Sequence, residues 1–220
     1  MLAKIKFCGL TRAEDAAVAT EVGASYAGVI FAESPRRLTP AAARNVLAGA
    51  GEAVKRVGVF GTNAPDEIAR IADEVRLDVV QLHADPTAAD VMAVKDRFAG
   101  HVWAAVRVGD THIADETQIV LESADAIVLD ARSQHLLGGT GQALPWSDLA
   151  ADLARMRGGV SVVLAGGLTA ANVETAMRTL APDVVDVSSG VESSPGIKDR
   201  GRMEAFAAAV AGSPRRKNAG

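Results

Sequence analysis

The 220-residue sequence is poor in several features, and each shortage excludes a class of protein. It contains one cysteine, Cys8, which excludes an internal disulfide and a cysteine-based zinc cluster. Only 4% of the residues are aromatic and the formal net charge is −4, so the chain offers nucleic acid neither a stacking surface nor an attractive field. No apolar run approaches the about 20 residues that a membrane helix needs, so we expect no membrane partner.

The first residues, MLAKIKFCGL, show no apolar core or cleavage site of a signal peptide, so a cytoplasmic location is expected. The composition is otherwise ordinary for a globular protein, with 49% hydrophobic and 23% charged residues. The length suffices for one large core. We therefore expect one domain over residues 1–212 and a polar, basic tail over residues 213–220.

Apolar stretches alternate with helix-like segments along the whole chain, without a break in composition. Strands are predicted at 4–8, 26–31, 55–60, 78–82, 102–106, 126–129, 160–165 and 184–187. Near-continuous apolar runs such as VGVF and AIVL are typical of parallel strands that helices cover. Eight such units predict an α/β protein with a (β/α)8 (TIM) barrel. An open doubly wound sheet is the alternative, but its usual Gly-rich turn after the first strand is replaced here by CGLT.

Capping residues predict where two of the helices begin. Thr11 stands three residues before Glu14, which predicts a capping box and a helix that ends near Glu21. Thr39 and Pro40 predict a second helix start, with a cap followed by proline in the first turn. Further helices are predicted over 65–75, 87–98, 115–121, 146–156, from about 169, and over 202–210.

Small residues follow the last two predicted strands, in LAGGL and DVSSG. Backbone N–H groups at such turns, together with the positive end of a helix dipole, favour an anion. In (β/α)8 barrels the loops after strands seven and eight are the usual phosphate site. We therefore expect Gly166, Gly167, Ser189 and Gly190 to bind a phosphate. Gly139 and Gly141 lie in a Gly-rich run that either is a flexible loop or closes over the ligand near the phosphate.

Polar side chains stand at the ends of several predicted strands, where the active sites of these barrels lie. They are Cys8, Gln81, His83, Asp130 and Asp186. Their apolar neighbours occupy the opposite parity, so these polar side chains are expected to share the inner face of the barrel.

Cys8 and Asp130 are the candidates for proton transfer. A lone cysteine is more often a buried apolar residue, but a thiol at the mouth of a barrel could be made acidic by nearby positive charge. Lys6, on the same face, either supplies that charge or pairs with a carboxylate such as Asp186. Asp130 either caps the following loop or acts as a general acid with a raised pKa. A thiolate base and a carboxylic acid suit a sugar isomerisation.

Arg36 and His83 can each be interpreted as a functional or as a structural residue. Arg36 could hold a carboxylate through two hydrogen bonds, whereas its neighbour Arg37 is interpreted as a solvated cation. His83 is either a core histidine or part of the site. It has no second histidine or carboxylate at the spacing of metal ligands, so no metal site is predicted.

Several motifs in fixed order resemble those of the phosphoribosylanthranilate isomerase family. They are KIKFCGLT, SPRRL, VGVF, VQLHA, VLDA, GGTG followed by PW, LAGGLTAANV and DVSSGVESSPGIKD. The resemblance extends to about residue 199, and the opening and closing motifs together are highly specific. It implies a cofactor-independent enzyme that converts N-(5-phosphoribosyl)anthranilate, a phosphosugar, to 1-(2-carboxyphenylamino)-1-deoxyribulose 5-phosphate by an Amadori rearrangement in tryptophan biosynthesis.

The resemblance also implies a role for particular residues. Cys8 of the opening motif would be the general base at C2 of the ribose, and Asp130 of VLDA the general acid at the ring oxygen. Arg36 of SPRRL would bind the anthranilate carboxylate, and Asp186 would lie near the anthranilate amine. Gln81 and His83 of VQLHA are the further substrate-binding candidates.

Three alternatives remain open from the sequence. An isomerase of the analogous aminoaldose in histidine biosynthesis, or an enzyme of both substrates, would share the phosphate turns but use aspartate where Cys8 stands. A metal-dependent phosphopentose epimerase lacks its histidine and aspartate ligands here. A non-catalytic phosphosugar-binding barrel would have no need of Cys8 and Asp130. Either a monomer or a homodimer is compatible with the sequence.

Overall fold

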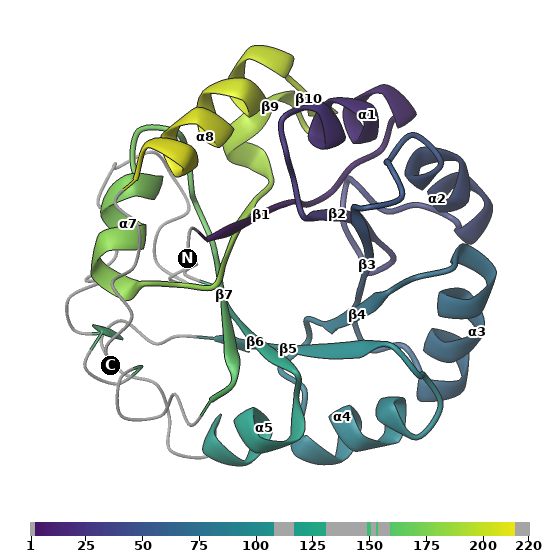
Figure 1. The fold of residues 1–220 in the computed structure, drawn as a ribbon. Coiled ribbons are helices and arrows are strands. Elements are labelled where there is room, and N and C mark those ends of the chain that lie inside the picture. Colours follow the sequence, from purple (N-terminus) through teal and green to yellow (C-terminus); the bar gives the residue numbers. More distant parts are fainter. Residues whose placement is uncertain (1–2, 108–116, 131–148, 151–152, 154–158, 214–220) are drawn as a thin grey trace.

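Eight parallel strands close into a barrel in the order β1 to β8, with helices around it (Figure 1). This computed structural model describes residues 3–107, 117–130, 149–150, 153 and 159–213. The strands are β1 (Lys4–Phe7), β2 (Tyr26–Ile30), β3 (Lys55–Phe60), β4 (Val79–Leu82), β5 (His101–Arg107), β6 (Ala126–Asp130), β7 (Ser161–Ala165) and β8 (Val184–Val187). The predicted (β/α)8 barrel is therefore confirmed.

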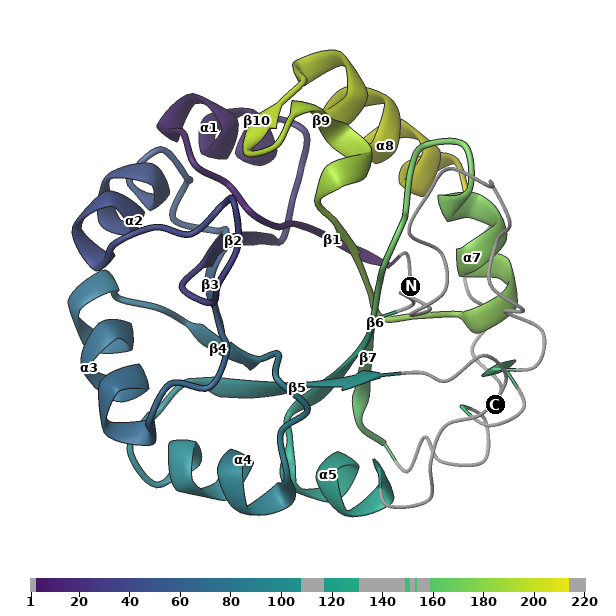
Figure 2. The same ribbon diagram turned by 180° about the vertical axis from the view of Figure 1, so that it is seen from behind.

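The described helices form the outer ring, which Figure 2 shows from the opposite end of the barrel. They are α1 (Ala13–Glu21), α2 (Pro40–Leu47), α3 (Pro65–Val75), α4 (Ala88–Lys95), α5 (Thr117–Ser123), α7 (Val173–Leu180) and α8 (Arg200–Gly212). The predicted helix over 146–156 and the loop before it lie outside the described residues, apart from helical positions at 149, 150 and 153.

Side chains alternate between the two sides of each strand, and this alternation produces two separate hydrophobic cores. One parity packs outward against the helices, and the other fills the barrel. Inside the barrel lie Val57, Val79, Trp103, Ala105, Ala126, Val128, Val163, Ala165 and Val184, with the ring of Tyr26 4.9 Å from that of Trp103 at 69°. The polar residues Gln81, Asp130 and Asp186 each follow an inward residue by two positions, so they project inward as predicted.

The barrel closes where the first strand pairs with the last. Lys4 to Phe7 of β1 run in register with Val184 to Val187 of β8, and Lys6 is paired with Asp186. Two motifs that are about 180 residues apart in the chain therefore lie side by side. This seam brings the cysteine motif to the second of the two small-residue turns.

The predicted capping box at Thr11 and Glu14 is wrong. Helix α1 begins at Ala13, Arg12 is its N-cap, and no side chain caps it by a hydrogen bond. The Thr11 hydroxyl instead donates to the carbonyl of Gly196, far along the chain. The hydrogen bond to Gly196, which is distant in the sequence, replaces the local capping interaction that the motif predicted. Thr39 does cap α2, whose Ala42 N–H donates to its hydroxyl at 3.3 Å.

The boundaries of several helices differ from prediction. Helix α7 begins at Val173 rather than near Thr169, because the Thr169 N–H donates to Asn172 Oδ1 at 2.8 Å in a turn of its own. Helix α4 is shorter than predicted and begins with a capping box between Thr87 and Asp90. Helix α8 extends further than predicted at both ends.

A short antiparallel hairpin, which the sequence did not predict, lies between β8 and α8. It consists of β9 (Glu192–Ser194) and β10 (Ile197–Lys198), and Lys198 pairs with Glu192 across it. The turn between them contains Gly196 at φ +83°. Asp199 follows and accepts a hydrogen bond from the Arg202 N–H at 2.9 Å, which starts α8. The hairpin lies beside α1 at the rim (Figure 1).

Within the described ranges, no helix has the length and apolar character to cross a membrane. Of the predicted tail over residues 213–220, only Ser213 lies within the description, where it is buried behind the end of α8.

Candidate active site

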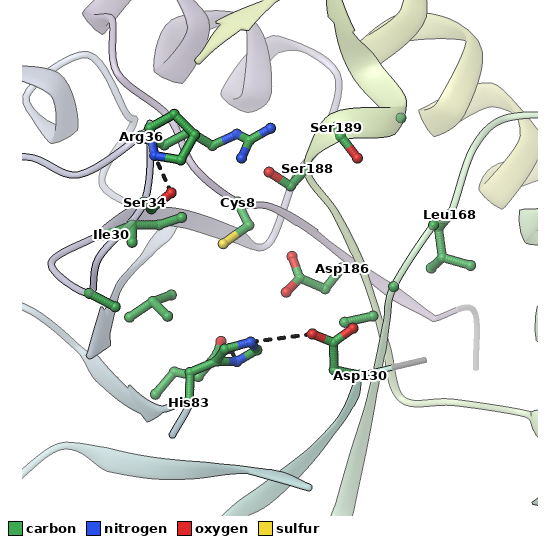
Figure 3. A pocket seen from close by; sticks show the side chains of 18 of the residues that line it. Cys8, Ile30, Ser34, Arg36, His83, Asp130, Leu168, Asp186, Ser188 and Ser189 are labelled. Carbon is green, nitrogen blue, oxygen red and sulfur yellow. Dashed lines mark hydrogen bonds and ion pairs between the residues drawn. The ribbon is translucent and has the colours of Figure 1, made fainter. Parts of the chain in front are cut away.

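A cavity of about 260 Å³ opens at the carboxyl ends of the strands. Ten of the twelve site residues that the sequence singles out line it, and they are Cys8, Arg36, Gln81, His83, Asp130, Gly166, Gly167, Asp186, Ser189 and Gly190. The other two, Gly139 and Gly141, lie outside the described residues. Figure 3 shows the thiol and the Asp186 carboxylate pointing into one space, with His83 and Asp130 across it.

Cys8 is held at the floor of this cavity by the backbone that follows β1. Its N–H donates to the Val187 carbonyl at 2.9 Å, which extends the seam by one residue. A Cβ on Gly28 of the neighbouring strand would lie 3.3 Å from the thiol sulfur and 3.2 Å from Lys6 Cε. Gly28 therefore leaves the room that the inward Lys6 and Cys8 side chains occupy.

Lys6 forms a buried ion pair with Asp186, which is one of the two roles that the sequence predicted for this lysine. Lys6 Nζ lies 2.7 Å from Asp186 Oδ2, and the Lys6 side chain is fully buried. Burial lowers the pKa of Lys6, but the charges and hydrogen bonds of Asp186 and Cys8 together outweigh it and leave the pKa raised. The ammonium is therefore charged. The second oxygen, Asp186 Oδ1, is buried without a hydrogen-bond partner among the described residues.

The expectation that positive charge makes Cys8 acidic is wrong for this structure. Burial raises the pKa of the Cys8 thiol, the charge of Lys6 lowers it, and Asp186 raises it again. The net direction is upward, because desolvation of a thiolate is the largest effect and Asp186 partly cancels Lys6. The thiol is thus a poor acid, and its thiolate is correspondingly a strong base.

Asp130 is in contact with His83 across the cavity. His83 Nε2 lies 3.3 Å from Asp130 Oδ2, and His83 Nδ1 lies 3.3 Å from the side-chain nitrogen of Gln81. His83 is 36% exposed, so it is a residue of the cavity and not of the core. The Gln81 side chain is buried, and its Oε1 has no hydrogen-bond partner among the described residues.

Arg36 is already paired with a carboxylate that the sequence analysis missed. Its Nε and Nη2 donate to Glu192 Oε1 and Oε2 at 2.7 and 2.6 Å. Lys198, also missed, donates to Glu192 Oε1 at 2.8 Å and to the Ser188 carbonyl at 3.1 Å. Burial raises the pKa of Glu192, but these hydrogen bonds and charges lower it to about 2. Arg37 is exposed, as predicted.

The two small-residue turns lie against each other. Gly166 and Gly167 have φ values of +87° and +66°, a region that glycine adopts without strain. A Cβ on Gly190 would stand 1.9 Å from the carbonyl oxygen of Leu168, so only glycine lets the second turn approach the first. The N–H groups of Gly167, Ser189 and Gly190 donate to no described residue. They are available for an anion.

The predicted contribution of helix dipoles to this anion site is not supported. Helix α7 begins only at Val173, and the second turn leads into the three-residue 3₁₀ helix Ser189–Val191. An anion bound at these turns would therefore meet backbone N–H groups and not the end of a helix of several turns. Among the residues described, no three histidine, cysteine, aspartate or glutamate side chains are grouped to hold a metal ion.

Comparison with known proteins identifies similar chains over nearly the full length. The family model described as N-(5'-phosphoribosyl)anthranilate (PRA) isomerase matches residues 5–209. The N-(5'-phosphoribosyl)anthranilate isomerase of Rubrobacter xylanophilus is 41% identical over 210 residues, which are 95% of this chain and 99% of that protein. That of Geobacter sulfurreducens is 41% identical over 206 residues, 93% and 97% of the two chains.

Solved structures agree with this result. The crystal structure of phosphoribosyl anthranilate isomerase from Thermotoga maritima has a TM-score of 0.86 and 33% identity, covering 96% of this chain and 100% of that one. A second structure, of a phosphoribosyl anthranilate isomerase in complex with reduced 1-(o-carboxyphenylamino)-1-deoxyribulose 5-phosphate, has a TM-score of 0.80 and 32% identity with the same coverage.

Proposed function

We infer the reaction from one premise, that this chain belongs to the N-(5'-phosphoribosyl)anthranilate isomerase family. It is accordingly an intramolecular aldose–ketose isomerase of tryptophan biosynthesis. We propose that it converts N-(5-phosphoribosyl)anthranilate to 1-(2-carboxyphenylamino)-1-deoxyribulose 5-phosphate with its own side chains and no cofactor. Cys8 would be the general base and Asp130 the general acid.

The substrate has an anion at each end, and the cavity offers a partner for each. The N–H groups of Gly167, Ser189 and Gly190, which donate to none of the described residues, favour the phosphate, with Gly166 completing the first turn. Arg36, which also lines the cavity, would bind the anthranilate carboxylate. Fixing both ends orients the ribose between them, and such orientation is itself a large part of catalysis.

The first chemical step would open the ring. Asp130 gives its proton to the ring oxygen, the bond from that oxygen to C1 breaks, and the nitrogen lone pair forms the C=N bond of a protonated Schiff base. Asp186 Oδ1, which has no described partner, would accept the N–H of the anthranilate amine. Gln81 and His83 would bind the ribose hydroxyl groups, with Gln81 Oε1 as a buried acceptor.

The second step would transfer the C2 proton. The Cys8 thiolate takes this proton, and the electrons of the C–H bond form the C1=C2 bond of an enolamine while the Schiff base nitrogen becomes neutral. The enolamine then tautomerises, as its C2 hydroxyl loses a proton and C1 gains one, to give the ketone. Burial and Asp186 raise the pKa of the Cys8 thiol, and the charge of Lys6 opposes them by favouring the thiolate that this step requires.

The observation that carries the proposal is the placement of one thiol and one carboxyl at different strand ends of the same cavity, next to an anion site. The test is to compare Cys8→Ala and Asp130→Asn with wild type. We expect each variant to lower kcat at least about a hundredfold, since a general acid or base contributes that much. The dissociation constant of the reduced product analogue, measured by calorimetry, should change little.

Arg37→Ala serves as the control, because Arg37 is exposed and does not line the cavity. It should keep wild-type kcat and KM. Full activity of Cys8→Ala would disprove the assignment of the base. If the variants bind normally and the wild type does not turn the substrate over, the chain is a phosphosugar-binding barrel. Turnover of the histidine-pathway aminoaldose at a comparable rate would show an enzyme of both substrates.

A further inference from the structure

We propose that Glu192 is the positioning residue for Arg36, and that it fixes the guanidinium so that one edge stays open to the substrate carboxylate. This inference rests on the proposed role of Arg36 and extends it to a residue outside the reacting groups. Glu192 is buried, and it stands at the start of the β9–β10 hairpin, which a plain (β/α)8 barrel does not need.

The contact uses a particular edge of the guanidinium. Arg36 Nε and Nη2 both donate to Glu192, whereas Nη1 donates to no described residue. An arginine has five N–H donors in a planar fork, so the Glu192 carboxylate takes two and leaves three. Those three lie on Nη1 and the outer side of Nη2. This second edge can hold another carboxylate through two parallel hydrogen bonds.

The stem of Arg36 is confined as well as its tip. A Cβ on Gly9 would come within 2.5 Å of Arg36 Cδ, so the arginine crosses directly over the backbone of the cysteine motif. Gly9 has a φ of +69°, which other residues adopt rarely. With its stem against Gly9 and its tip on Glu192, the long side chain loses rotamer freedom before any ligand arrives. Because the side chain is ordered before binding, less conformational entropy is lost when the substrate binds.

Glu192 is itself held by donors only. Its Oε1 accepts from Arg36 Nε, from Lys198 Nζ at 2.8 Å and from the Gly196 N–H at 3.3 Å. Such a site needs both carboxylate oxygens as acceptors, and the pKa of Glu192 near 2 keeps them ionised. Because Lys198 also donates to the Ser188 carbonyl, the same hairpin connects the arginine to the phosphate turn.

An opposite effect of Glu192 has to be weighed. Its negative charge beside Arg36 reduces the attraction of the guanidinium for an anionic substrate. Burial lowers the pKa of Lys198, and the hydrogen bond and charge of Glu192 oppose this effect. With the Lys198 ammonium charged, the three groups together carry a net charge of +1. Whether Glu192 raises or lowers the affinity for the substrate then depends on how it orients the guanidinium, since a fixed guanidinium forms two charge-assisted hydrogen bonds at once. The geometry therefore points to a gain in affinity from Glu192.

Glu192→Gln is the sharpest variant, because it keeps the shape but replaces one acceptor oxygen with an N–H donor that faces Arg36 or Lys198. We expect the affinity for reduced 1-(o-carboxyphenylamino)-1-deoxyribulose 5-phosphate to fall about tenfold, as on partial loss of charge-assisted hydrogen bonds. The affinity for the same analogue without the carboxyl group should stay within about twofold. In turnover, KM should rise while kcat changes little.

Asp15→Asn is the matched control. Asp15 is buried and accepts two hydrogen bonds from Arg12 and one, at 3.2 Å, from the Lys198 N–H, so its replacement loosens the same hairpin without touching Arg36. This variant should lose stability and keep the preference for the carboxyl-bearing analogue. If it loses that preference to the same extent, the effect belongs to the integrity of the loop and the proposal is overturned.

The remaining outcomes separate this inference from the proposed function. If the wild type binds both analogues equally, the proposed role of Arg36 fails and this inference fails with it. If the wild type prefers the carboxyl group and Glu192→Gln prefers it as strongly, or binds it more tightly, only the positioning role is overturned. Should Glu192→Gln fail to fold, Glu192→Asp keeps the charge but is one methylene too short, and the same preference should weaken.

Discussion

At the scale of single residues, the environment of Cys8 makes the thiol a weak acid. Burial raises its pKa more than the charge of Lys6 lowers it, and Asp186 cancels part of that charge. A base of high pKa accepts a proton from carbon more readily, but only a small fraction of the enzyme carries it at neutral pH. The seam between the first and last strands sets this balance, since it contributes both charges.

The ionisation of the thiol follows from this balance. The fraction of thiolate falls about tenfold for each pH unit below the pKa. Because burial raises that pKa, we expect the rate at which iodoacetamide alkylates Cys8 to keep rising above about pH 8, near the ordinary pKa of a thiol. Cys8 is the only cysteine of the sequence, so alkylation followed by mass spectrometry from pH 6 to 10 reports this residue alone. An alkylation rate that levels off near pH 6 would show that the thiol is acidic.

Sequence alone predicted the residues that belong to strand ends, for a physical reason. The period of two along a strand and the position of its last residue are local properties, and they placed Cys8, Asp130 and Asp186 in one cavity. The partner of Arg36 was not predictable in this way. Glu192 is 156 residues away, and only the closed barrel brings the two together. Lys198 was missed for the same reason, although both lie in a motif that the sequence analysis quoted.

At the scale of elements, the contact between the two small-residue turns depends on Gly190. Its missing Cβ lets the turn after β8 approach the carbonyl of Leu168 after β7. The sequence predicted both turns from their small residues, but it predicted helix dipoles that the structure does not provide. It also assigned Thr11 to a capping box, although that hydroxyl contacts the hairpin. Local motifs were thus reliable where no distant segment competes.

Gly190→Ala should separate the two turns, because its Cβ would overlap the Leu168 oxygen at 1.9 Å. We expect the affinity for inorganic phosphate to fall about tenfold or more, as is usual when binding groups are displaced by about 1 Å. Calorimetry with phosphate measures this. Gly212→Ala is the control, since nothing lies within 4 Å of its new Cβ. Equal phosphate affinity in both variants would count against the proposed site.

At the scale of the whole molecule, closure of the barrel places a buried ion pair across its seam. Lys6 and Asp186 are register partners on the first and last strands, and their side chains are 2.7 Å apart in the interior. An unpaired charge in that position is strongly unfavourable. The pair therefore favours closure with this register, besides affecting the pKa of the Cys8 thiol.

Lys6→Met should destabilise the fold, because it leaves the Asp186 carboxylate buried without its cation. We expect the free energy of unfolding to fall by about 3–5 kcal/mol. Urea denaturation gives the value. Lys55→Met, which removes an exposed pair with Asp78, should cost no more than about 1 kcal/mol. Equal stability of the two variants would mean that the seam does not depend on the buried pair.

The pairing of the first strand with the last also determines when the cavity can be completed during synthesis of the chain. The ribosome delivers Lys6 and Cys8 first, and the residues that complete their surroundings, from Asp186 to Lys198, emerge only near the end. Until then the nascent barrel has an open side, a lysine without its counter-ion and an arginine without Glu192. A partly made chain lacks the turn after β8 and the carboxylate that pairs with Arg36, so the cavity is complete only once the last strand and the hairpin have been made.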